Sequence, residues 1–552
     1  MDGRTVPAEE WVYVLDSSSL LDDVFASLTL KRKLEQGRLS PADCPGTVVG
    51  RVAKADRATV ERAVEAAARA APEWGAFPLE TRLDEVGTLL RRRLEEHAED
   101  IAALLVAEGH PLALARWQVS GMLDCFGSES LGFYRSQMLQ EFHRGERRLQ
   151  VRRRPDGVVC LNPPQNAPLS SALLGVTAVM GGNALVVRAP RSAPLGVMYV
   201  MQEIVGPVLA EVGAPPGTLN AVCGDPAPLL SAWLEHPAVD DIIYFGSSEN
   251  GARFEARCVA AGKKPILELA GNDIVTVWKD ADLDLAAEAL TESFYGSGQL
   301  CMIPNLVLVH PEAAEGLVER LVRQIGHVRP GHPWEDDVLL TPVLRSEKFF
   351  ACLQDARDKG AEVVCGGHAM RLDETRDPHG IFLEPTVVLV RGLDGAREIE
   401  AVRHETFFPL LPLVVAAPDT PDGELLDSFV DFVNTNRYGL RNSLWARDGK
   451  TVDAFLARVA SGGLLKVNDS HIGFLPYLPT HGGTGLTGGV FGEANYPILR
   501  TTHMQGVSIS TGSRPKEAVF GAWRRLTPYE RNTGRNIERN PQRSTEEKPC
   551  AR

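Results

Sequence analysis

Two short stretches of the sequence hold residues that could carry out covalent chemistry together. Cys301 follows Gly-Gln-Leu in GSGQLCMIPN, residues 296–305. A thiolate is a strong nucleophile, although most cysteines in soluble proteins are inert buried residues. Glu268 stands among apolar residues in ILELAGND, residues 266–273. Apolar surroundings disfavour the carboxylate and raise its pKa toward the range of a general base. An exposed Glu at a strand end is an equal interpretation of this stretch.

Two further stretches offer groups that stabilise negative charge. Asn166 lies between prolines in LNPPQNAPLS, and an amide held in that frame could donate a hydrogen bond to a developing oxyanion. A turn-forming Asn is the commoner arrangement. In YFGSSENGARF an apolar strand ends at Gly246, Ser247 follows, and Gly251 opens a helix. A helix N-terminus suits a dinucleotide pyrophosphate, but the signal is weak alone because the spacing is not G-x-G-x-x-G.

The pattern of apolar residues predicts the elements that must position these groups. Within residues 57–108 apolar residues recur every three or four positions, which indicates amphipathic helices. From 155 to 251, and again from about 272 to 465, short β-branched runs alternate with helical stretches. This alternation is typical of parallel sheets with crossover helices, in which ligands bind at the carboxyl ends of the strands. We therefore expect two α/β domains with the chemistry between them.

Composition restricts the classes of function. The chain has 552 residues, is 44% hydrophobic and carries a formal net charge of −14. Nucleic acid and anionic membranes reward clustered Lys and Arg, so neither is expected as a main partner. The nine cysteines include no Cys-x-x-Cys pair, and the thirteen His show no ligand spacing, so neither a metal site nor a disulfide framework is indicated. These features favour a reducing, cytoplasmic location.

One apolar stretch approaches the length of a membrane span. Residues 169–187 contain no charged side chain, but Gly181-Gly182-Asn183 interrupts them and the part that follows is β-branched. A helix, a turn and a buried strand are therefore expected, and not a transmembrane helix. The N-terminus lacks a basic start followed by an apolar core, so no secretory signal is expected.

The order of the motifs carries more information than any single motif. A strand ending before Asn166, then VVRAPRSAP, FGSSENG, LELAG, GQLC and HETFFP, follow one another as in the aldehyde dehydrogenase superfamily, which the chain resembles from about residue 45 to about residue 510. The resemblance implies that Cys301 is the nucleophile, that Glu268 activates water, and that Asn166 with the Cys301 backbone amide forms the oxyanion hole. It implies NAD(P)-dependent oxidation of an aldehyde to a carboxylic acid through a cysteine thiohemiacetal and thioester.

The resemblance also implies the architecture. The expected fold is α/β, with a Rossmann-like cofactor domain, a catalytic domain and a β-hairpin oligomerisation arm that makes a homodimer or homotetramer. The expected divisions are 1–125 for the N-terminal helical part of the cofactor domain, 126–158 for the arm, 159–270 for the Rossmann-like domain, 271–470 for the catalytic domain, 471–512 for the return to the cofactor domain and arm, and 513–552 for a basic tail. The tail holds ten Lys or Arg against five Asp or Glu, and we expect it to be solvated and mobile.

The implied cofactor residues include one departure from the family pattern. Where the family generally has Lys-Pro-Ser-Glu, this chain has Arg188-Ala189-Pro190-Arg191. The family Glu favours an unphosphorylated adenosine ribose, whereas a guanidinium suits phosphate, so we predict a preference for NADP over NAD. The carboxylate and the aromatic residue at the nicotinamide ribose correspond to Glu405 and Phe407. The full implied set is Pro164, Arg188, Arg191, Gly246, Ser247, Gly251, Leu269, Glu405 and Phe407.

The substrate wall also departs from the family. The implied tunnel residues are Gln165, Ala167, Leu174, Leu300 and Met302. The first three stand where bulky aromatic side chains are usual, so we predict a wider tunnel and an aldehyde bulkier than acetaldehyde. Gly175 occupies a position at which the family has a Lys that is sometimes proposed to relay a proton.

Two other functions remain open on the sequence. A CoA-acylating aldehyde dehydrogenase would pass the thioester to coenzyme A, but such relatives usually lack the Glu found at position 268. A nucleotide-binding relative without catalytic activity would not need Asn166, Glu268, Cys301 and Glu405 together. In that case Cys301 would alkylate no faster than the other cysteines.

Overall fold

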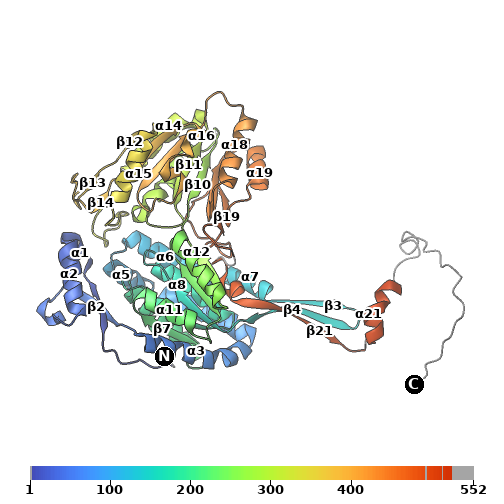
Figure 1. The fold of residues 1–552 in the computed structure, drawn as a ribbon. Helices are drawn as coiled ribbons and strands as arrows, with labels where there is room; N and C mark the ends of the chain where they lie inside the picture. The colour runs from blue at the N-terminus through green and yellow to red at the C-terminus, as the bar shows by residue number, and fades with distance from the viewer. Residues whose placement is uncertain (1–2, 491–493, 513, 525–552) are drawn as a thin grey trace, which may run out of the picture. The chain divides into compact units, whose positions relative to one another are not determined.

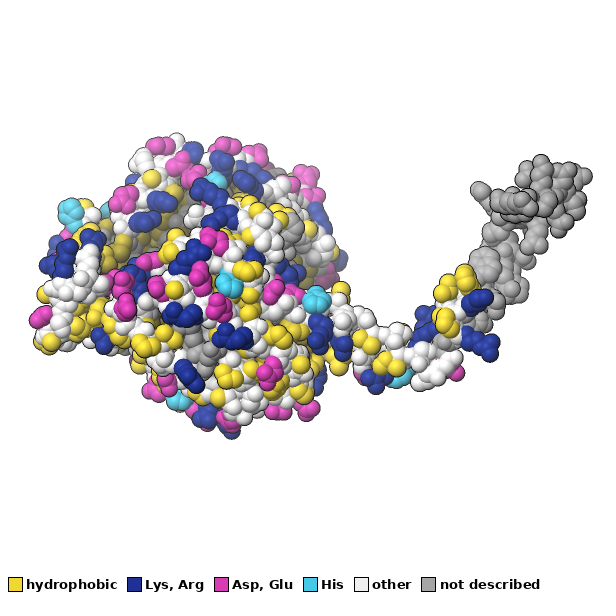
Figure 2. Space-filling view, turned by 60° about the horizontal axis from the view of Figure 1, so that its bottom comes forward, with side chains coloured by type: hydrophobic (Ala, Val, Ile, Leu, Met, Phe, Trp, Pro, Cys, Tyr) yellow, Lys and Arg dark blue, Asp and Glu magenta, His cyan; other side chains and the backbone are white. Residues whose placement is uncertain are grey.

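Two units make up the computed structural model, which describes residues 3–490, 494–512 and 514–524 (Figure 1). The larger unit contains Arg153–His503 and the described residues before 139. The smaller unit contains Leu139–Arg152 and the described residues from Met504 onward. Over the face of the larger unit seen in Figure 2, Lys and Arg side chains are interspersed with Asp and Glu side chains.

A five-stranded parallel sheet forms one α/β domain of the larger unit. Its strand order is β7-β6-β5-β8-β9. The strands are β5 (Val158–Asn162), β6 (Ala184–Ala189), β7 (Leu219–Cys223), β8 (Asp241–Phe245) and β9 (Lys264–Glu268). Every residue of β5 and β6 is buried, as expected for parallel strands that are covered on both faces.

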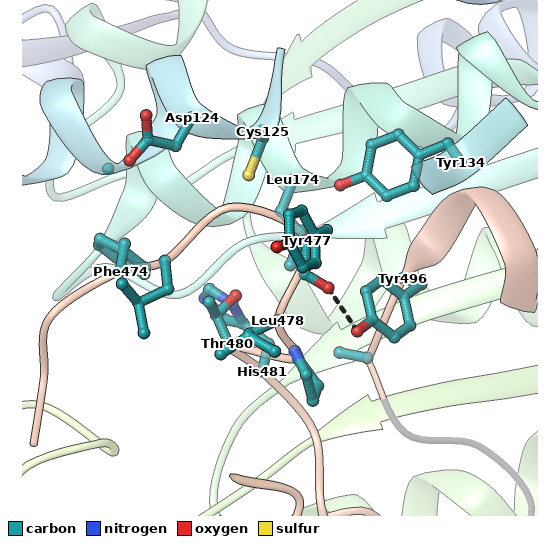
Figure 3. A pocket seen from close by; sticks show the side chains of 14 residues that line it. Asp124, Cys125, Tyr134, Leu174, Phe474, Tyr477, Leu478, Thr480, His481 and Tyr496 are labelled. Atoms are coloured by element: carbon teal, nitrogen blue, oxygen red, sulfur yellow. Dashed lines mark hydrogen bonds between the residues drawn. The ribbon is translucent and has the colours of Figure 1, made fainter. Parts of the chain in front are cut away.

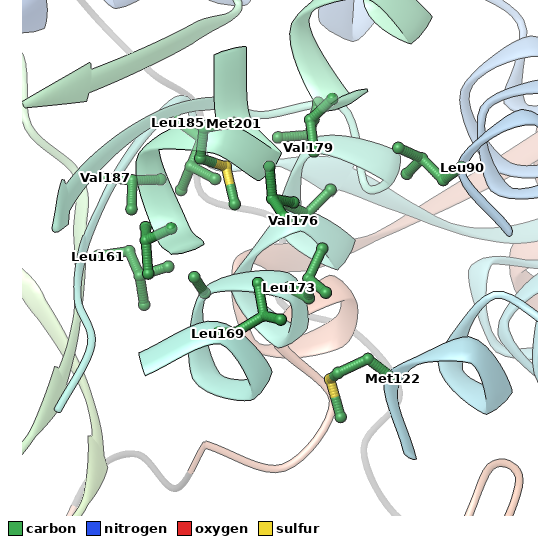
Figure 4. Close-up of a cluster of buried hydrophobic side chains, with 14 of the residues drawn as sticks. Leu90, Met122, Leu161, Leu169, Leu173, Val176, Val179, Leu185, Val187 and Met201 are labelled. Atoms are coloured by element: carbon green, nitrogen blue, oxygen red, sulfur yellow. The ribbon is translucent and has the colours of Figure 1, made fainter. Parts of the chain in front are cut away.

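Helices cover both faces of this sheet. The helix α8 (Pro168–Met180) buries every residue, because it packs between the sheet and two further helices, α4 (Val86–Glu96) and α6 (Leu112–Cys125) (Figure 4). The other face is covered by α3 (Arg57–Ala76), α11 (Pro226–Glu235) and α12 (Ser248–Ala260). The apolar stretch 169–187 is therefore a buried helix, a turn and a strand, as predicted. Within the described residues, no helix has the length and apolar character that crossing a membrane requires.

A seven-stranded sheet forms the second α/β domain. Its order is β12-β15-β16-β11-β10-β18-β19, and only β12 runs antiparallel to its neighbour. The strands are β10 (Asp273–Val277), β11 (Pro304–Val309), β12 (Glu362–Cys365), β15 (Thr386–Arg391), β16 (Leu410–Val415), β18 (Arg441–Trp445) and β19 (Leu464–Val467). The helices α13 (Leu283–Leu290) and α14 (Pro311–Ile325) pack on one face, and α15 (Glu347–Asp358), α18 (Asp422–Asn434) and α19 (Gly449–Arg458) on the other. The two expected α/β domains are both present.

The N-terminal region contains strands as well as the expected helices. An antiparallel pair is formed by β1 (Trp11–Leu15) and β2 (Val48–Ala53), and α1 (Ser17–Asp22) and α2 (Val24–Glu35) lie between them in sequence. Asp23 begins α2 by accepting a hydrogen bond from the Ala26 backbone N–H at 2.9 Å, which satisfies one of the free amides of the first turn. Helix α2 also lines the cavity at the carboxyl ends of β5 and β6.

The smaller unit differs in its boundaries from the expected arm. Its sheet has the order β21-β4-β3, formed by β3 (Leu139–Arg144), β4 (Arg147–Pro155) and β21 (Thr502–Ser510). The expected start at residue 126 was wrong, because α7 (Ser128–Met138) buries Leu131, Tyr134 and Met138 in the core of the larger unit.

The expected tail also begins with regular structure. Residues Pro515–Arg524 form α21, where a mobile tail had been predicted. Pro515 occupies the first helical position, where its fixed φ favours a helix start. The rest of the predicted tail, residues 525–552, lies outside the described residues.

Candidate active site

The two sheets bring Cys301 and Glu268 together. Glu268 is the last residue of β9, and Cys301 lies between the 3₁₀ segment η4 (Thr291–Gly298) and β11. The Cys301 Sγ donates a hydrogen bond to Glu268 Oε1 at 3.2 Å. Gly271 allows this approach, because a Cβ at that position would lie 2.0 Å from the Cys301 carbonyl oxygen. The predicted nucleophile and base are therefore in direct contact.

Burial changes the proton affinity of both groups. It raises the pKa of Glu268 to about 8, against the opposing effect of hydrogen bonds from Cys301 and the Gly482 backbone. Burial, together with the negative charges of Glu268 and Glu405, raises the pKa of Cys301 well above its usual range. Cys301 is therefore a neutral thiol beside a carboxyl that changes its protonation state near neutral pH. A base with such a pKa is suited to proton abstraction.

Asn166 belongs to the same site. Its side-chain Nδ2 donates a hydrogen bond to the Gln299 carbonyl oxygen at 2.9 Å, two residues before Cys301. Gln299 is itself anchored, because its side-chain amide donates to Thr341 Oγ1 at 3.1 Å and to the Pro342 carbonyl oxygen at 3.0 Å. The side chains of Asn166 and Glu268 thus both contact the short segment 299–301, which ends at Cys301.

A loop from the C-terminal region fixes the Glu268 carboxylate. The Gly482 backbone N–H donates to Glu268 Oε2 at 3.2 Å. Two residues earlier, the Thr480 carbonyl oxygen accepts a 2.7 Å hydrogen bond from the guanidinium of Arg441, which also donates to the His471 carbonyl oxygen at 2.7 Å. Arg441 therefore anchors the loop that positions the predicted base.

Arg441 belongs to a buried polar cluster that sequence reasoning missed. Its backbone N–H donates to Asp273 Oδ1 at 3.2 Å, and the other Asp273 oxygen lies 3.2 Å from His471 Nε2. The His471 Nδ1 lies 2.7 Å from Ser443 Oγ. Arg441, Asp273, His471 and Ser443 are each only 1% exposed. Residues 273 and 441 are far apart in sequence, so no local pattern indicates their pairing.

Replacing Arg441 with Met is expected to lower the free energy of unfolding by about 2–5 kcal/mol, because the His471 and Thr480 carbonyl oxygens would lose the hydrogen bonds that the buried guanidinium donates. The measurement is a urea titration. The matched control is Arg447→Met, since Arg447 has an exposed ion pair with Asp282 at 2.7 Å and exposed pairs contribute less than about 1 kcal/mol. Equal losses in the two variants would contradict this account of the cluster.

A cavity of about 790 Å³ lies at the carboxyl ends of β5 and β6. The predicted cofactor residues Pro164, Arg188 and Arg191 line it. Its size and its basic wall suit a nucleotide, and its place at the strand ends is where dinucleotides bind in such sheets. Gln165 lines the same cavity and accepts a hydrogen bond from Ser192 Oγ at 3.1 Å. Its assignment to the substrate tunnel stays a prediction, and the next residue, Asn166, bonds the Gln299 carbonyl oxygen instead.

The helix α12 starts three residues after Phe245, which lines this cavity. Ser247 caps α12, and its Oγ accepts from the Asn250 backbone N–H at 3.4 Å. The Gly251 backbone N–H is already bonded to the Ser247 carbonyl oxygen at 2.8 Å. A Cβ on Gly251 would lie 2.2 Å from the Leu269 side chain, and one on Gly246 would lie 2.7 Å from the Tyr244 hydroxyl. Glycine at 251 is therefore needed for packing against Leu269.

Glu405 and Phe407 lie near the catalytic segment. The Glu405 Oε1 accepts a hydrogen bond from the Gly271 backbone N–H at 3.0 Å, and burial raises the pKa of Glu405 to about 8. Phe407 has a φ of +57°, in the left-handed region that a residue other than Gly rarely adopts, and its side chain remains 37% exposed. The strained backbone holds the Phe407 ring out from the core.

A small cavity lies beside Leu174. A cavity of about 20 Å³ lies there between Leu174, Phe474, Tyr477 and His481 (Figure 3). That volume accommodates about one water molecule. The Tyr496 hydroxyl donates to the Tyr477 carbonyl oxygen at 2.6 Å, which helps to fix this loop.

Phe474 packs beside the predicted tunnel residues. Its ring stacks on Trp117 with centroids 5.0 Å apart, and a Cβ on Gly121 would lie only 1.9 Å from the ring. The remaining predicted tunnel residues are buried: Ala167 precedes α8, and Leu300 and Met302 pack in the same cluster as Phe474. At Gly175, a Cβ would lie 2.3 Å from the Leu161 side chain, so packing excludes a Lys there.

Comparisons with known proteins agree with this fold. The model of the aldehyde dehydrogenase family matches residues 33–504. The chain is 29% identical to succinate-semialdehyde dehydrogenase [NADP(+)] of Escherichia coli (strain K12) and 30% identical to 3-sulfolactaldehyde dehydrogenase of Pseudomonas putida, in each case over 73% of this chain and 80% of the relative.

Solved structures show the same fold. An NAD-dependent aldehyde dehydrogenase from Sinorhizobium meliloti superposes with a TM-score of 0.75 at 24% identity, over 93% of this chain and 94% of the other. A glyceraldehyde-3-phosphate dehydrogenase from Methanocaldococcus jannaschii, complexed with NADP, superposes with a TM-score of 0.72 at 23% identity, over 84% of this chain and 97% of the other.

The two α/β domains and the cavity at the strand ends define the class of NAD(P)-dependent oxidoreductases. Within that class, the chain belongs to the aldehyde dehydrogenase family. This membership confirms the resemblance, the fold class and the NAD(P)-dependent aldehyde oxidation that the sequence motifs predicted.

Proposed function

We propose that Cys301 is the nucleophile, Glu268 the general base and Asn166 an oxyanion donor in the oxidation of an aldehyde to a carboxylic acid. The observation that carries this assignment is the 3.2 Å contact between Cys301 Sγ and Glu268 Oε1. The Asn166 amide, 2.9 Å from the Gln299 carbonyl oxygen, supports the placement of an oxyanion near the backbone of Cys301.

The contact between Cys301 and Glu268 supports the first step. The Glu268 carboxylate takes the proton of the Cys301 thiol, and the thiolate adds to the aldehyde carbon. The carbonyl oxygen becomes an alkoxide, which the Asn166 amide and the Cys301 backbone N–H stabilise. Because both donors are held by the fold before the substrate arrives, they need little rearrangement when the charge develops.

The cavity beside β5 and β6 supports the second half of the reaction. Arg188, Pro164 and the helix start at Ser247 would hold the dinucleotide, and Glu405 and Phe407 its nicotinamide ribose. A bound oxidised nicotinamide would supply the acceptor for the hydride of the carbon attached to Cys301. Once Glu268 has released the thiol proton to solvent, it takes a proton from the water molecule that hydrolyses the thioester, and the carboxylic acid leaves.

Replacing Asn166 with Ala is expected to lower kcat on the order of 10²–10³-fold with a small change in KM, because one donor to the alkoxide is lost. The check is steady-state kinetics with the best aldehyde found. A large rise in KM at unchanged kcat would contradict the oxyanion role, since it would indicate that Asn166 binds substrate and transition state equally.

The activity test is nicotinamide reduction over a broad panel of aldehydes, with NAD and NADP in parallel. We expect one carboxylic acid per reduced nicotinamide, without a requirement for coenzyme A, and higher kcat/KM for aldehydes larger than acetaldehyde. The names of the relatives, which refer to semialdehydes and sulfolactaldehyde, support this substrate size. Because Phe474 fills the space beside Leu174, such a substrate would have to displace its ring. Formation of an acyl-CoA would instead support the acylating alternative.

The NADP preference and the homo-oligomer also remain proposals. Lys31, Arg188 and Arg191 give the cavity a basic wall that suits an additional phosphate. In the smaller unit every residue of β3 is exposed, and Phe142 is 50% and Met504 70% exposed, which supports a sheet that pairs with a second copy. Light scattering of the purified chain distinguishes a dimer or tetramer from a monomer. A cytoplasmic location is proposed on the composition alone.

A further inference from the structure

Helix α2 reaches the cofactor cavity although almost all of it precedes the segment matched by the family model. The helix spans Val24–Glu35, whereas the family match begins at residue 33. Four of its residues line the cavity together with Arg191: Leu28, Lys31, Arg32 and Glu35. Part of the wall of this cavity therefore comes from the N-terminal region.

Charged groups of α2 hold Arg191, the residue on which the predicted NADP preference rests. The guanidinium of Arg191 bonds to Glu35 Oε2 at 2.5 Å and also to the Asp225 carboxylate. The Lys31 Nζ donates to the Arg191 carbonyl oxygen at 3.3 Å. The Arg191 guanidinium is thus already paired, and a phosphate would have to compete for it with the carboxylates of Glu35 and Asp225.

The same cluster leaves two polar atoms unsatisfied. Within the described part of the chain, Glu35 Oε1 and Arg191 Nε are buried without a hydrogen-bond partner. Buried polar atoms are rarely left unpaired in proteins. One is an acceptor and the other a donor, and both belong to residues that line the cavity. A ribose diol, which both donates and accepts, complements this pair.

We propose that helix α2 forms the adenosine-ribose end of the cofactor site, and that Glu35 is a specificity-determining residue that restrains Arg191 and opposes a 2′-phosphate. Lys31 acts in the opposite direction, since its ammonium attracts that phosphate. The balance of the two charges lets the site accept a ribose with or without the phosphate. This proposal rests on the cavity being the cofactor site.

Two variants with opposite expected effects test the proposal. Glu35→Gln removes one carboxylate from Arg191 while keeping the size of the side chain, so the guanidinium becomes more available to a phosphate. Lys31→Met removes a cation and keeps most of the apolar stem. The matched control is Glu235→Gln, the same substitution in an ion pair with Arg57 at 2.7 Å on the surface.

The measurement is titration calorimetry of the full chain with adenosine 2′,5′-bisphosphate and with 5′-AMP, two ligands that differ only in the 2′-phosphate. In Glu35→Gln we expect selectivity for the bisphosphate to rise about tenfold or more. In Lys31→Met it should fall, and in Glu235→Gln it should stay as in the unmodified chain. Thermal unfolding of each variant shows whether it is folded.

The possible results distinguish a failure of the role proposed for α2 from a failure of the proposed cofactor site. If both ligands bind the unmodified chain but the selectivity is unchanged in Glu35→Gln and Lys31→Met, the role of α2 is wrong and the cofactor site stands. If both variants shift selectivity in the same direction, the charge argument is wrong. If neither ligand binds the unmodified chain, the cavity is not the adenosine site, and both proposals fail.

Discussion

Replacing Cys301 with Ala is expected to abolish nicotinamide reduction with every aldehyde, a loss on the order of 10⁴-fold or more in kcat. The reason is that no other thiol of the described chain contacts Glu268, so no thiohemiacetal can form next to the base. Steady-state reduction of NAD and NADP with the best aldehyde is the measurement. Binding of 5′-AMP should be unchanged, because the adenosine cavity does not include Cys301.

The control for Cys301 is Cys352→Ala, a partly exposed cysteine in α15. This variant should keep full activity. Comparable activity in Cys301→Ala and the unmodified chain would show that the family fold is used here without covalent catalysis. A loss of activity in both variants would instead indicate that cysteine substitution damages the fold, which circular dichroism would reveal.

Replacing Glu268 with Gln is expected to lower steady-state turnover on the order of 10²–10⁴-fold. The amide can take a proton neither from the Cys301 thiol nor from water, so both the formation and the hydrolysis of the thioester should slow. Rapid mixing should therefore show no burst of reduced nicotinamide, and mass spectrometry of the intact chain should find little acyl group on Cys301. A full burst of about one reduced nicotinamide per active site would show that Cys301 loses its proton without Glu268.

The pH dependence of the unmodified chain follows from the same carboxyl group. Glu268 acts as a base only when ionised, and its pKa is raised to about 8. Turnover should therefore rise as the pH passes through about 8 and level off above it. In Glu268→Gln this rise should disappear. A rise of equal size in the variant would assign the pH dependence to another group and would count against Glu268 as the base.

Local patterns predicted most of the fold because each element is encoded by neighbouring residues. The uncharged stretch 169–187 was predicted as a helix, a turn and a strand, since the glycines at 181 and 182 interrupt the apolar run. The three candidate catalytic residues were found through the order of their motifs. Their proximity in space could not be worked out from spacing alone, because it depends on two separate sheets meeting at their strand ends.

Sequence patterns could not reveal interactions with distant parts of the chain. The guanidinium predicted to suit a phosphate, that of Arg191, is bonded to Glu35, 156 residues earlier. The tunnel around Ala167 and Leu174 stays a prediction, and Phe474, which is far from Leu174 in the sequence, lines a small cavity with it. Arg441 and Asp273 were not considered at all, since a charged residue within a strand normally indicates a solvent-facing position and here both are buried.

The loop that carries Phe474 also carries Gly482, whose backbone amide holds Glu268. An aldehyde large enough to displace the Phe474 ring therefore pushes on the same segment that orients the base. This shared loop predicts induced fit. A substrate that moves Phe474 would also move Gly482, which would change the orientation of Glu268 and therefore the rate of thioester hydrolysis. Substitutions in residues 474–482 that enlarge the pocket should then alter KM and kcat together, so substrate range and turnover cannot be tuned separately by changing this loop.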